Sequence, residues 1–418
     1  MRRVAGVGLL LLLSTGACSV AGPRAGGPGD AGVPGATGAE PAVRVGVVVD
    51  TPSLEVAGTA GLELVDADGT VRSRTGAGET RVASRVGDGV EIAGGGEALR
   101  TPGAVTLRPR GGGLVVVNGT SYRGAVLVRA AERGVTAVNL LDMETYLLGV
   151  VPLEIGKGRP PEEVEAVKAQ AIAARTYALR HMGRRSSLGF DFYGSVMDQV
   201  YGGVDADDPV SARAVRETRG EILVHDGAPI EAYYHSTCGG RTAALEEVWP
   251  GEPRPYLKSV SDARPGGGFY CESSNRFRWT ESWTRDALVA TLERGLAAHV
   301  GRTVDPGRIR AMALTGRTQS GRAEALRIAT DAGEFRVRGD SIRWVLRPAP
   351  NRILNSALIE LHPEGDGDVT GLTIEGGGWG HGIGMCQIGA VGRARDGQSY
   401  REILLTYYPG SRIARLYR

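Results

Sequence analysis

Short runs of valine and leucine, separated by glycine-rich turns, fill residues 43–141 and constrain the fold of this chain more than any other feature. Runs of β-branched residues that are bounded by glycine predict strands. These runs lie at 43–49, 62–65, 114–117, 126–128 and 135–138. This part of the chain carries no motif typical of catalysis, so residues 43–134 are predicted to form a β-rich N-terminal module with a structural or docking role.

The clearest helix follows this β-rich part. Pro160 and Pro161 stand at its start, and acidic residues at 162, 163 and 165 suit the positive end of the helix dipole. Valine and alanine recur at helical spacing from 164 to 178, and Gly183 can end the helix. Further helices are predicted near 283–299 and 399–407, with strands and glycine turns in the rest of the C-terminal third. The chain is therefore predicted to be an α+β protein.

The first residues have the pattern of an export signal. Arg2 and Arg3 precede an apolar run, Leu9–Leu13, that is too short to span a bilayer. Small residues and a cysteine follow in a pattern that resembles a bacterial lipobox, which predicts a signal peptide over 1–17 and lipidation of Cys18. Cleavage near residue 17 with an incidental cysteine is the alternative. In both cases the protein is exported, and residues 18–42, rich in glycine, proline and alanine, are predicted to be a tether that lets the rest reach the cell wall.

The charge balance excludes one class of partner. The chain has 49 basic and 47 acidic residues, a net charge of +2. Loss of the two arginines of the signal leaves 49 − 2 = 47 basic residues against 47 acidic ones. The sequence therefore offers no electrostatic argument for nucleic-acid binding.

A single carboxyl group, Glu154, stands in an apolar run that begins at Tyr146. Its apolar neighbours are Val150, Val151, Leu153 and Ile155. Partial desolvation disfavours a carboxylate and raises its pKa, which is what a general acid needs near neutral pH. An ion pair with Arg175 or Lys157 that serves only the fold is the alternative.

Two polar residues interrupt the alanine-rich length of the predicted helix. Gln170 and Arg175 could hold the carboxyl group of Glu154 in place or bind substrate. Exposure of both side chains to solvent is the alternative.

A polar cluster, YYHSTCGGRT, spans residues 233–242. The hydroxyl groups of Ser236 and Thr237 and the backbone of Gly239 and Gly240 suit hydrogen bonding to a sugar. A plain tight turn is the alternative.

The cysteines allow three interpretations. Cys238 is predicted to form a disulfide with Cys271, which an exported protein permits. A zinc ion held by His235 and Cys238, three residues apart, is the second possibility, and free thiols are the third. Three cysteines remain after Cys18, so at least one has no intrachain partner for a disulfide.

The densest glycine segment, GGGWGHGIGMCQIGA, spans residues 376–390. It lacks the Gly-Lys-Ser/Thr ending of a phosphate loop, and so many glycines argue against regular secondary structure. Glycine lets the backbone approach a ligand or another segment closely. His381 could handle protons or bind substrate here, and a buried histidine that fixes the loop is the alternative.

Taken in order, these segments resemble the SpoIID/LytB family, which comprises stage II sporulation protein D and the amidase-enhancer proteins. The resemblance extends from about 135 to 415 and rests on residues 146–154, 169–177, 199–202, 234–240, 320–322 and 380–390. The chain departs from the family at Ile155, where methionine is common, and at Cys386, where serine is common. The resemblance implies a mixed α/β catalytic region with a substrate cleft over residues 135–418.

The same resemblance implies a peptidoglycan lytic transglycosylase, which cleaves MurNAc–GlcNAc β-1,4 bonds in peptide-stripped glycan strands and leaves 1,6-anhydro ends. Glu154 matches the family's catalytic glutamate and would act first as acid and then as base. No cofactor is expected apart from the possible zinc ion. On this hypothesis the glycan cleft is lined by Tyr201, His235, Ser236, Thr237, His381 and Gln387. The alternative is a wall-binding activator of an N-acetylmuramoyl-L-alanine amidase, and such an amidase is the expected protein partner.

Overall fold

The computed structural model describes residues 38–418. The predicted signal peptide 1–17, the predicted lipidation site Cys18 and most of the predicted tether lie outside these residues. The last tether residues belong to the fold, because Pro41 O accepts a hydrogen bond from Met143 N (3.0 Å) and the Glu40 carboxylate accepts one from Glu144 N (2.7 Å). Within residues 38–418, no helix combines the length and the apolar character that crossing a membrane requires.

The N-terminal part is a pair of packed β-sheets, as the runs of valine and leucine predict. The strand β2 (Ser53–Gly58) shows the period of two, since Leu54 and Val56 are buried whereas Ser53 and Glu55 are exposed. The first sheet contains, in spatial order, β13 (Phe192–Tyr193), β1 (Ala42–Thr51), β12 (Val135–Asp142), β11 (Ala125–Ala130), β8 (Ala104–Pro109), β3 (Leu62–Val65) and β4 (Val71–Arg74). The second contains β10 (Thr120–Tyr122), β9 (Val115–Val117), β2, β5 (Arg81–Val86), β6 (Gly89–Ala93) and β7 (Leu99–Pro102).

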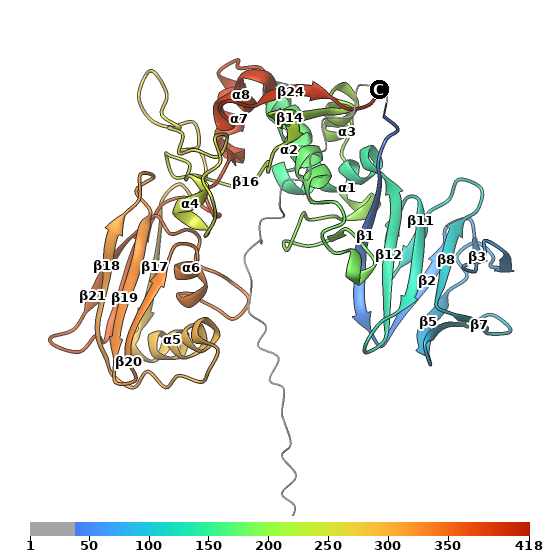
Figure 1. Cartoon of the computed structure of the whole chain (residues 1–418), viewed down its shortest axis with the longest axis horizontal. Helices are drawn as coiled ribbons and strands as arrows, with labels where there is room; N and C mark the ends of the chain where they lie inside the picture. Colours follow the sequence, from blue (N-terminus) through green and yellow to red (C-terminus); the bar gives the residue numbers. More distant parts are fainter. Residues whose placement is uncertain (1–37) are drawn as a thin grey trace, which may run out of the picture.

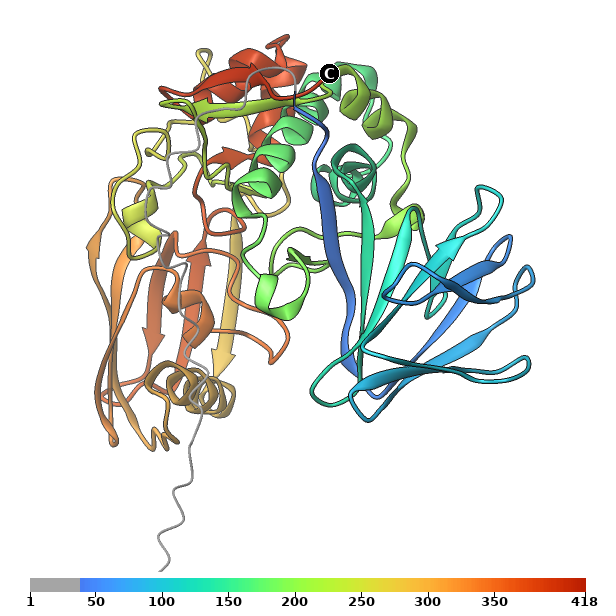
Figure 2. The ribbon, with the colours of Figure 1, turned by 45° about the vertical axis from the view of Figure 1, so that its right-hand side comes forward.

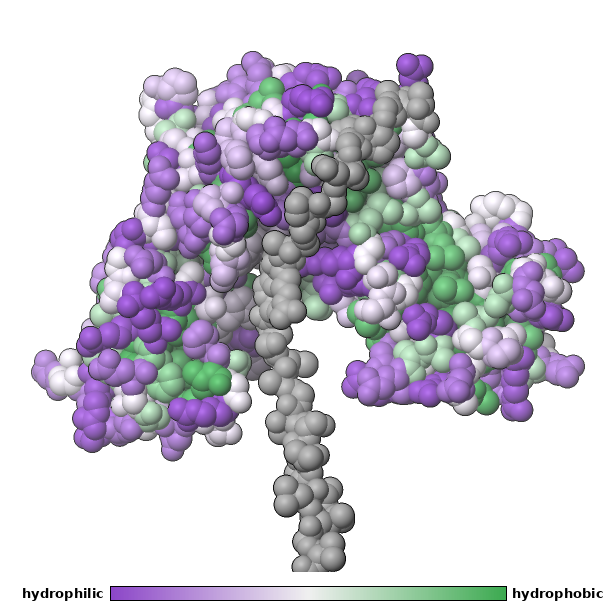
Figure 3. Space-filling model, in the orientation of Figure 1, coloured by the Kyte–Doolittle hydropathy of each residue, from purple (hydrophilic) through white to green (hydrophobic). Residues whose placement is uncertain are grey.

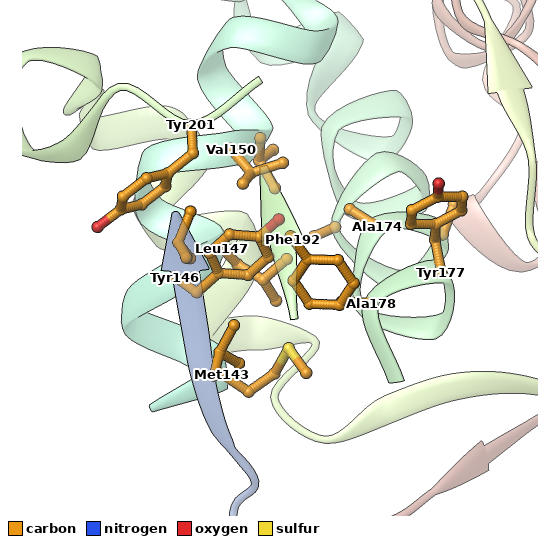
Figure 4. Close-up of a cluster of buried hydrophobic side chains, with 14 of the residues drawn as sticks. Met143, Tyr146, Leu147, Val150, Ala174, Tyr177, Ala178, Phe192 and Tyr201 are labelled. Atoms are coloured by element: carbon orange, nitrogen blue, oxygen red, sulfur yellow. The ribbon is translucent and has the colours of Figure 1, made fainter. Parts of the chain in front are cut away.

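Helices form the centre of the molecule. The predicted helix is α2 (Val164–His181), preceded by a 3-10 turn, Pro161–Glu163. The apolar run that ends in Glu154 is also helical, α1 (Met143–Ile155), which the sequence did not reveal because this helix is buried on nearly every side and shows no amphipathic period. Figure 4 shows side chains of α1 packed against Phe192 and near those of α2.

The remaining elements of the centre come from distant parts of the chain. They include α3 (Pro209–Glu217), α4 (Leu245–Val248), α7 (Gln387–Arg395) and α8 (Tyr400–Tyr407), with 3-10 turns at Ser186–Leu188 and Gly203–Ala206. A small sheet has the order β15 (Ala228–Pro229), β14 (Glu221–His225), β24 (Arg412–Arg415), and β16 (Tyr234–His235) pairs in parallel with β23 (Met385–Cys386). The prediction that residues 376–390 lack regular structure is wrong at their end, where β23 and the first turn of α7 lie.

A second body with its own apolar core is inserted between α4 and α7. It has two three-stranded sheets, β17 (Trp279–Thr284), β22 (Gly371–Gly376), β21 (Ile359–Glu364) and β18 (Ile309–Arg317), β19 (Ala323–Thr330), β20 (Gly333–Arg338). Its helices are α5 (Arg285–Val300), close to the predicted one, and α6 (Ser341–Val345). The chain enters and leaves this body on adjacent antiparallel strands, since Trp279 pairs with Gly376.

The molecule has the shape of an arch (Figure 1). The N-terminal sheets form one side and the inserted body the other, and the helical centre joins them; Figure 2 shows the same arrangement after a turn. In the space-filling view the outer ends of the two sides stand apart, and hydrophilic residues cover most of the visible face (Figure 3). Together with the mixed sheets and helices, this confirms an α+β fold with a β-rich N-terminal region.

Candidate active site

The helix α1 carries Glu154 in its last turn. Its first turn is capped by Asp142, whose carboxylate accepts a hydrogen bond from Thr145 N (2.8 Å). The apolar side chains of Met143, Tyr146, Leu147 and Val150 are fully buried and anchor the helix (Figure 4). A rigid, buried helix therefore sets the position of Glu154.

Glu154 is half-buried and forms no ion pair with any residue between 38 and 418. Its Oε1 atom accepts a hydrogen bond from Val200 N (3.0 Å). Burial raises the pKa of Glu154, and hydrogen bonds from Val200 N, Gln387 and Tyr234 only partly offset this effect. The negative end of the α1 dipole disfavours the carboxylate in the same direction. The site thus shifts Glu154 toward the protonated form relative to an exposed glutamate.

The alternative in which Glu154 pairs with Arg175 or Lys157 is wrong. Arg175 is almost completely buried and donates to both carboxylate oxygens of Glu144, at 2.8 and 2.7 Å. Lys157 Nζ donates to Asp205 O. Because Arg175 is fully engaged in this internal ion pair, its position does not support the prediction that it binds substrate.

A chain of neutral polar side chains surrounds Glu154. Gln387 Nε2 donates to Gln170 Oε1 (3.4 Å), which links the α2 glutamine to a residue that hydrogen-bonds Glu154. On the other side, Gln199 Nε2 donates to Tyr234 OH (2.9 Å), and Tyr146 OH donates to Gln199 Oε1 (3.1 Å). Gln170 Nε2 is buried without a partner among the described residues. Sequence reasoning singled out Gln170 and Gln387 but missed Tyr234 and Gln199, although both lie within the segments that carry the family resemblance.

The two predicted site histidines are buried or nearly so, and neutral. Burial lowers the pKa of His381 to about 4 and holds that of His235 well below its ordinary value. His381 is engaged at both nitrogens: Nδ1 accepts from Ile383 N (3.0 Å) and Nε2 donates to Tyr234 O (3.0 Å). This geometry favours the alternative in which His381 fixes the loop. His235 Nδ1 contacts Ile383 O (3.1 Å), and its Nε2 is buried without a partner among residues 38–418.

The hydroxyl groups predicted to bind sugar are connected to each other. Ser236 Oγ lies 3.2 Å from Thr237 Oγ1, which lies 2.8 Å from Ser274 Oγ. The backbone of Thr237 pairs with that of Trp379, whose side chain is 47% exposed and which sequence reasoning overlooked. Ser236 is half-buried, so of the two hydroxyl groups it is the more accessible.

Gly239 and Gly240 both have positive φ and both lie against neighbouring segments. Gly239 has φ +77°, and a side chain there would meet the backbone of Gly377 at 2.9 Å, so glycine is required for the close approach of the 233–242 and 376–390 segments. Gly240 has φ +117°, and a side chain there would meet the ring of Phe269 at 2.9 Å. Packing thus accounts for both glycines without a sugar. Whether their backbone also contacts a ligand stays a prediction.

Tyr201 packs inside the helical centre. Its hydroxyl donates to Asn139 Oδ1 (2.7 Å), and its ring lies 5.4 Å from that of Tyr146. A side chain on Gly149 would reach the Tyr201 ring at 2.4 Å, so this glycine makes room for it. Tyr201 supports the helix that carries Glu154, and its position does not support direct contact with a glycan.

The predicted disulfide pair lies close together without a bond. Cys238 Sγ and Cys271 Sγ are 3.4 Å apart, and Cys386 and Asp262 lie beside them. His235 is not part of this group, so the predicted zinc pair of His235 and Cys238 is not supported. The disulfide itself stays a prediction.

A concavity of about 780 Å³ lies on the inserted body, lined by residues of β17, β21 and β22 such as Trp279, Glu360 and Glu375. It does not include Glu154. The chemistry of the buried polar chain, rather than the volume of a cavity, identifies the candidate site.

Comparison with known proteins identifies the family of the chain. Residues 131–225, which include α1, α2 and Glu154, match the family model described as stage II sporulation protein. The stage II sporulation protein D of Bacillus subtilis is 31% identical over 294 residues, which cover 66% of this chain and 76% of that protein. The chain belongs to the stage II sporulation protein D family. An uncharacterised protein of Brachyspira hyodysenteriae is 33% identical over 295 residues, which cover 70% of this chain and 72% of that protein.

Two further matches are an amidase enhancer and a domain of unknown function. An amidase enhancer of Bacillus subtilis is 29% identical over 292 residues, which cover 64% of this chain but only 40% of that longer protein. Residues 264–384, which contain the inserted body, match the model of a domain of unknown function. The family model therefore covers Glu154 and its helices, whereas a separate model covers the insertion.

Proposed function

We propose that this protein is an exported peptidoglycan lytic transglycosylase in which Glu154 first donates and then accepts a proton. The observation that carries the proposal is a half-buried glutamate without a cationic partner among residues 38–418, surrounded by neutral hydrogen-bonding groups. Such an environment favours the protonated form that a general acid needs.

The reaction needs one carboxyl group. Glu154 protonates the glycosidic oxygen as the bond to the anomeric carbon breaks, and the C6 hydroxyl of the same sugar attacks that carbon. Its proton passes to the Glu154 carboxylate, which restores the acid, and the product is a 1,6-anhydro end. Glycosidases that use water need a second carboxylate about 5–9.5 Å from the first.

We also propose positioning roles for the residues around Glu154. Val200 N fixes one oxygen of Glu154, while Gln387 and Tyr234 orient the carboxyl group. Gln170 holds Gln387 and has an unpartnered, buried amide nitrogen. Ser236 offers a hydroxyl group for the glycan from the neighbouring segment.

The test is digestion of amidase-treated glycan strands by the purified chain, with products identified by mass spectrometry. Anhydro-ended fragments are expected from the native chain and none from the Glu154→Gln variant. The matched control is Glu162→Gln, which changes an exposed glutamate just before α2 and should leave activity unchanged. Reducing ends in place of anhydro ends would show that water is the nucleophile and would overturn the one-carboxyl mechanism.

The alternative, activation of a cell-wall amidase, is kept because one relative is named an amidase enhancer. It predicts that the chain binds glycan strands, cleaves none, and stimulates an amidase equally well in the native and Glu154→Gln forms. That result would replace the transglycosylase proposal.

A further inference from the structure

Four side chains with metal-binding atoms meet at one buried point beside the candidate site. They are Cys238, Asp262, Cys271 and Cys386, all buried, and their sulfur and oxygen atoms lie within 4.8 Å of one another. They come from the loop after β16, the loops before β17 and the residue that caps α7. We call this group the cysteine centre.

The shortest of its distances fit the edges of a tetrahedron. With zinc bonds of about 2.3 Å to sulfur and 2.0 Å to oxygen, tetrahedral geometry separates two sulfurs by about 3.8 Å and a sulfur from an oxygen by about 3.5 Å. Cys238 Sγ lies 3.4 Å from Cys271 Sγ and 3.5 Å from Asp262 Oδ2. A disulfide bond measures about 2.05 Å and would leave Asp262 and Cys386 without a role.

The groups around the centre are arranged as around metal ligands. Tyr407 OH donates to Asp262 Oδ1 (2.6 Å), which leaves Oδ2 facing the sulfurs. Backbone N–H groups point at the sulfurs: those of Cys238 and Gly389 lie 3.2 and 3.3 Å from Cys386 Sγ, and that of Gly240 lies 3.4 Å from Cys238 Sγ. Such N–H donors stabilise thiolates, the form of cysteine that binds metals.

Two buried arginines near the cysteine centre favour a negative net charge on it. Arg322 is buried and donates to Cys238 O (3.1 Å), its Nε is without a partner, and it has no carboxylate within ion-pair distance among the described residues. Arg393, also buried, lies 3.5 Å from Asp262. Three thiolates, one carboxylate and a divalent cation carry a net charge of −2, which two guanidinium groups balance.

We propose that the cysteine centre binds one structural Zn²⁺ ion through three thiolates and one carboxylate oxygen. Four protein ligands leave no open position, so the ion stabilises the fold and does not take part in catalysis. Cys271 precedes the inserted body and Cys386 follows it, so the ion closes the neck of that body. Cys386 also precedes Gln387, so the ion fixes the residue that orients Glu154.

Metal analysis of the purified chain, with intact-mass measurement under denaturing conditions, tests this proposal directly. We expect one zinc ion per chain and the mass of a fully reduced protein. Replacement by Co²⁺ should give the intense thiolate-to-cobalt absorption and visible bands of a tetrahedral site. A metal-free chain whose mass is lower by two hydrogen atoms, and which takes up no Co²⁺ after reduction, would overturn the proposal. Iron with inorganic sulfide would also overturn it.

Variants distinguish the ligand set. Asp262→Asn and Cys386→Ser should each weaken zinc binding at least about tenfold in competition with a chromogenic chelator. Ser274→Ala, close to the centre but not in it, is the matched control. If Cys386→Ser bound zinc as tightly as the native chain, the four-ligand assignment would be wrong. These measurements do not use glycan cleavage, so their results test the zinc site independently of the proposed function.

Discussion

The first and last turns of α1 each place a glutamate in the interior, and the two are treated in opposite ways. Glu144 accepts two hydrogen bonds from Arg175, one from Tyr417 OH (2.6 Å) and one from Gly220 N (3.2 Å). Glu154 has one backbone donor and neutral amide and hydroxyl neighbours. One helix thus carries an ion-paired carboxylate at its start and a carboxyl group without a cation at its end.

This difference distinguishes a glutamate that stabilises the fold, Glu144, from one that could transfer a proton, Glu154. A bidentate guanidinium engages both oxygens of a carboxylate and fixes its position. Without a cation, burial raises the pKa and keeps the proton available. The absence of a cationic partner among residues 38–418 therefore distinguishes Glu154 from Glu144, and the following predictions test that contrast.

The largest expected effect is on the rate of Glu154→Gln. We expect glycan cleavage to fall by about 10²–10⁴-fold or more, because proton transfer is lost while the shape is kept. Product formation over time, measured by mass spectrometry, checks this. A variant that retains more than a tenth of native activity would remove Glu154 from the mechanism.

Glu144→Gln should act on stability instead. It leaves the buried Arg175 charge without its partner, which costs about 3–5 kcal/mol in comparable buried ion pairs. Denaturant unfolding should show a lower midpoint, while the rate per folded molecule changes little. An unchanged midpoint would mean that the ion pair does not stabilise the fold.

The stability of the Glu154→Gln variant should depend on pH differently from that of the native chain. The pKa of Glu154 is raised in the folded state, so its favourable contribution is complete below the unfolded value and is lost as pH rises through the folded value. Glu154→Gln should therefore match the native chain in stability at low pH and exceed it at high pH. The native cleavage rate should fall over the same upper range. Thermal melts and rates across pH check both, and a rate that rises with pH there would contradict an acid role.

The smallest effect is expected for Tyr234→Phe. Tyr234 lowers the pKa of Glu154 by hydrogen bonding, so its loss should raise that pKa further and move the alkaline limit of activity to higher pH. The loss of one hydrogen bond corresponds to a change in rate of about two- to tenfold at neutral pH. Tyr193→Phe, outside the chain of polar groups, is the control. A shift to lower pH would show that Tyr234 acts differently.

The sequence predicted what depends on local pattern. Glycine turns and valine runs located the sheets, and the spacing of valine and alanine located α2. The isolation of Glu154 in an apolar run agreed with its burial. Residues 376–390 were misjudged at their end because Cys386 caps α7 by accepting from Gly389 N, which offsets the helix-breaking effect of glycine.

What depends on distant partners could not be predicted. Arg175 was predicted to bind substrate because the sequence shows no partner for it. Its partner, Glu144, lies 31 residues away, and no local pattern links the two residues. Asp262 lies in a loop without a periodic pattern, so nothing linked it to the cysteines. The ring nitrogens of His381 form hydrogen bonds with backbone atoms. Because every residue has such atoms, the sequence could not indicate these partners.

The neck of the inserted body has a consequence for how such proteins diversify. Its two strands leave the helical centre side by side at Trp279 and Gly376, and its apolar core is separate from that of the rest. The outer parts of an element joined in this way can be lengthened or shortened during evolution, provided that Arg322, which contacts Cys238 of the cysteine centre, is kept. The outer loops of this body, rather than the whole body, therefore offer protein engineers a place to graft a foreign segment with another binding specificity.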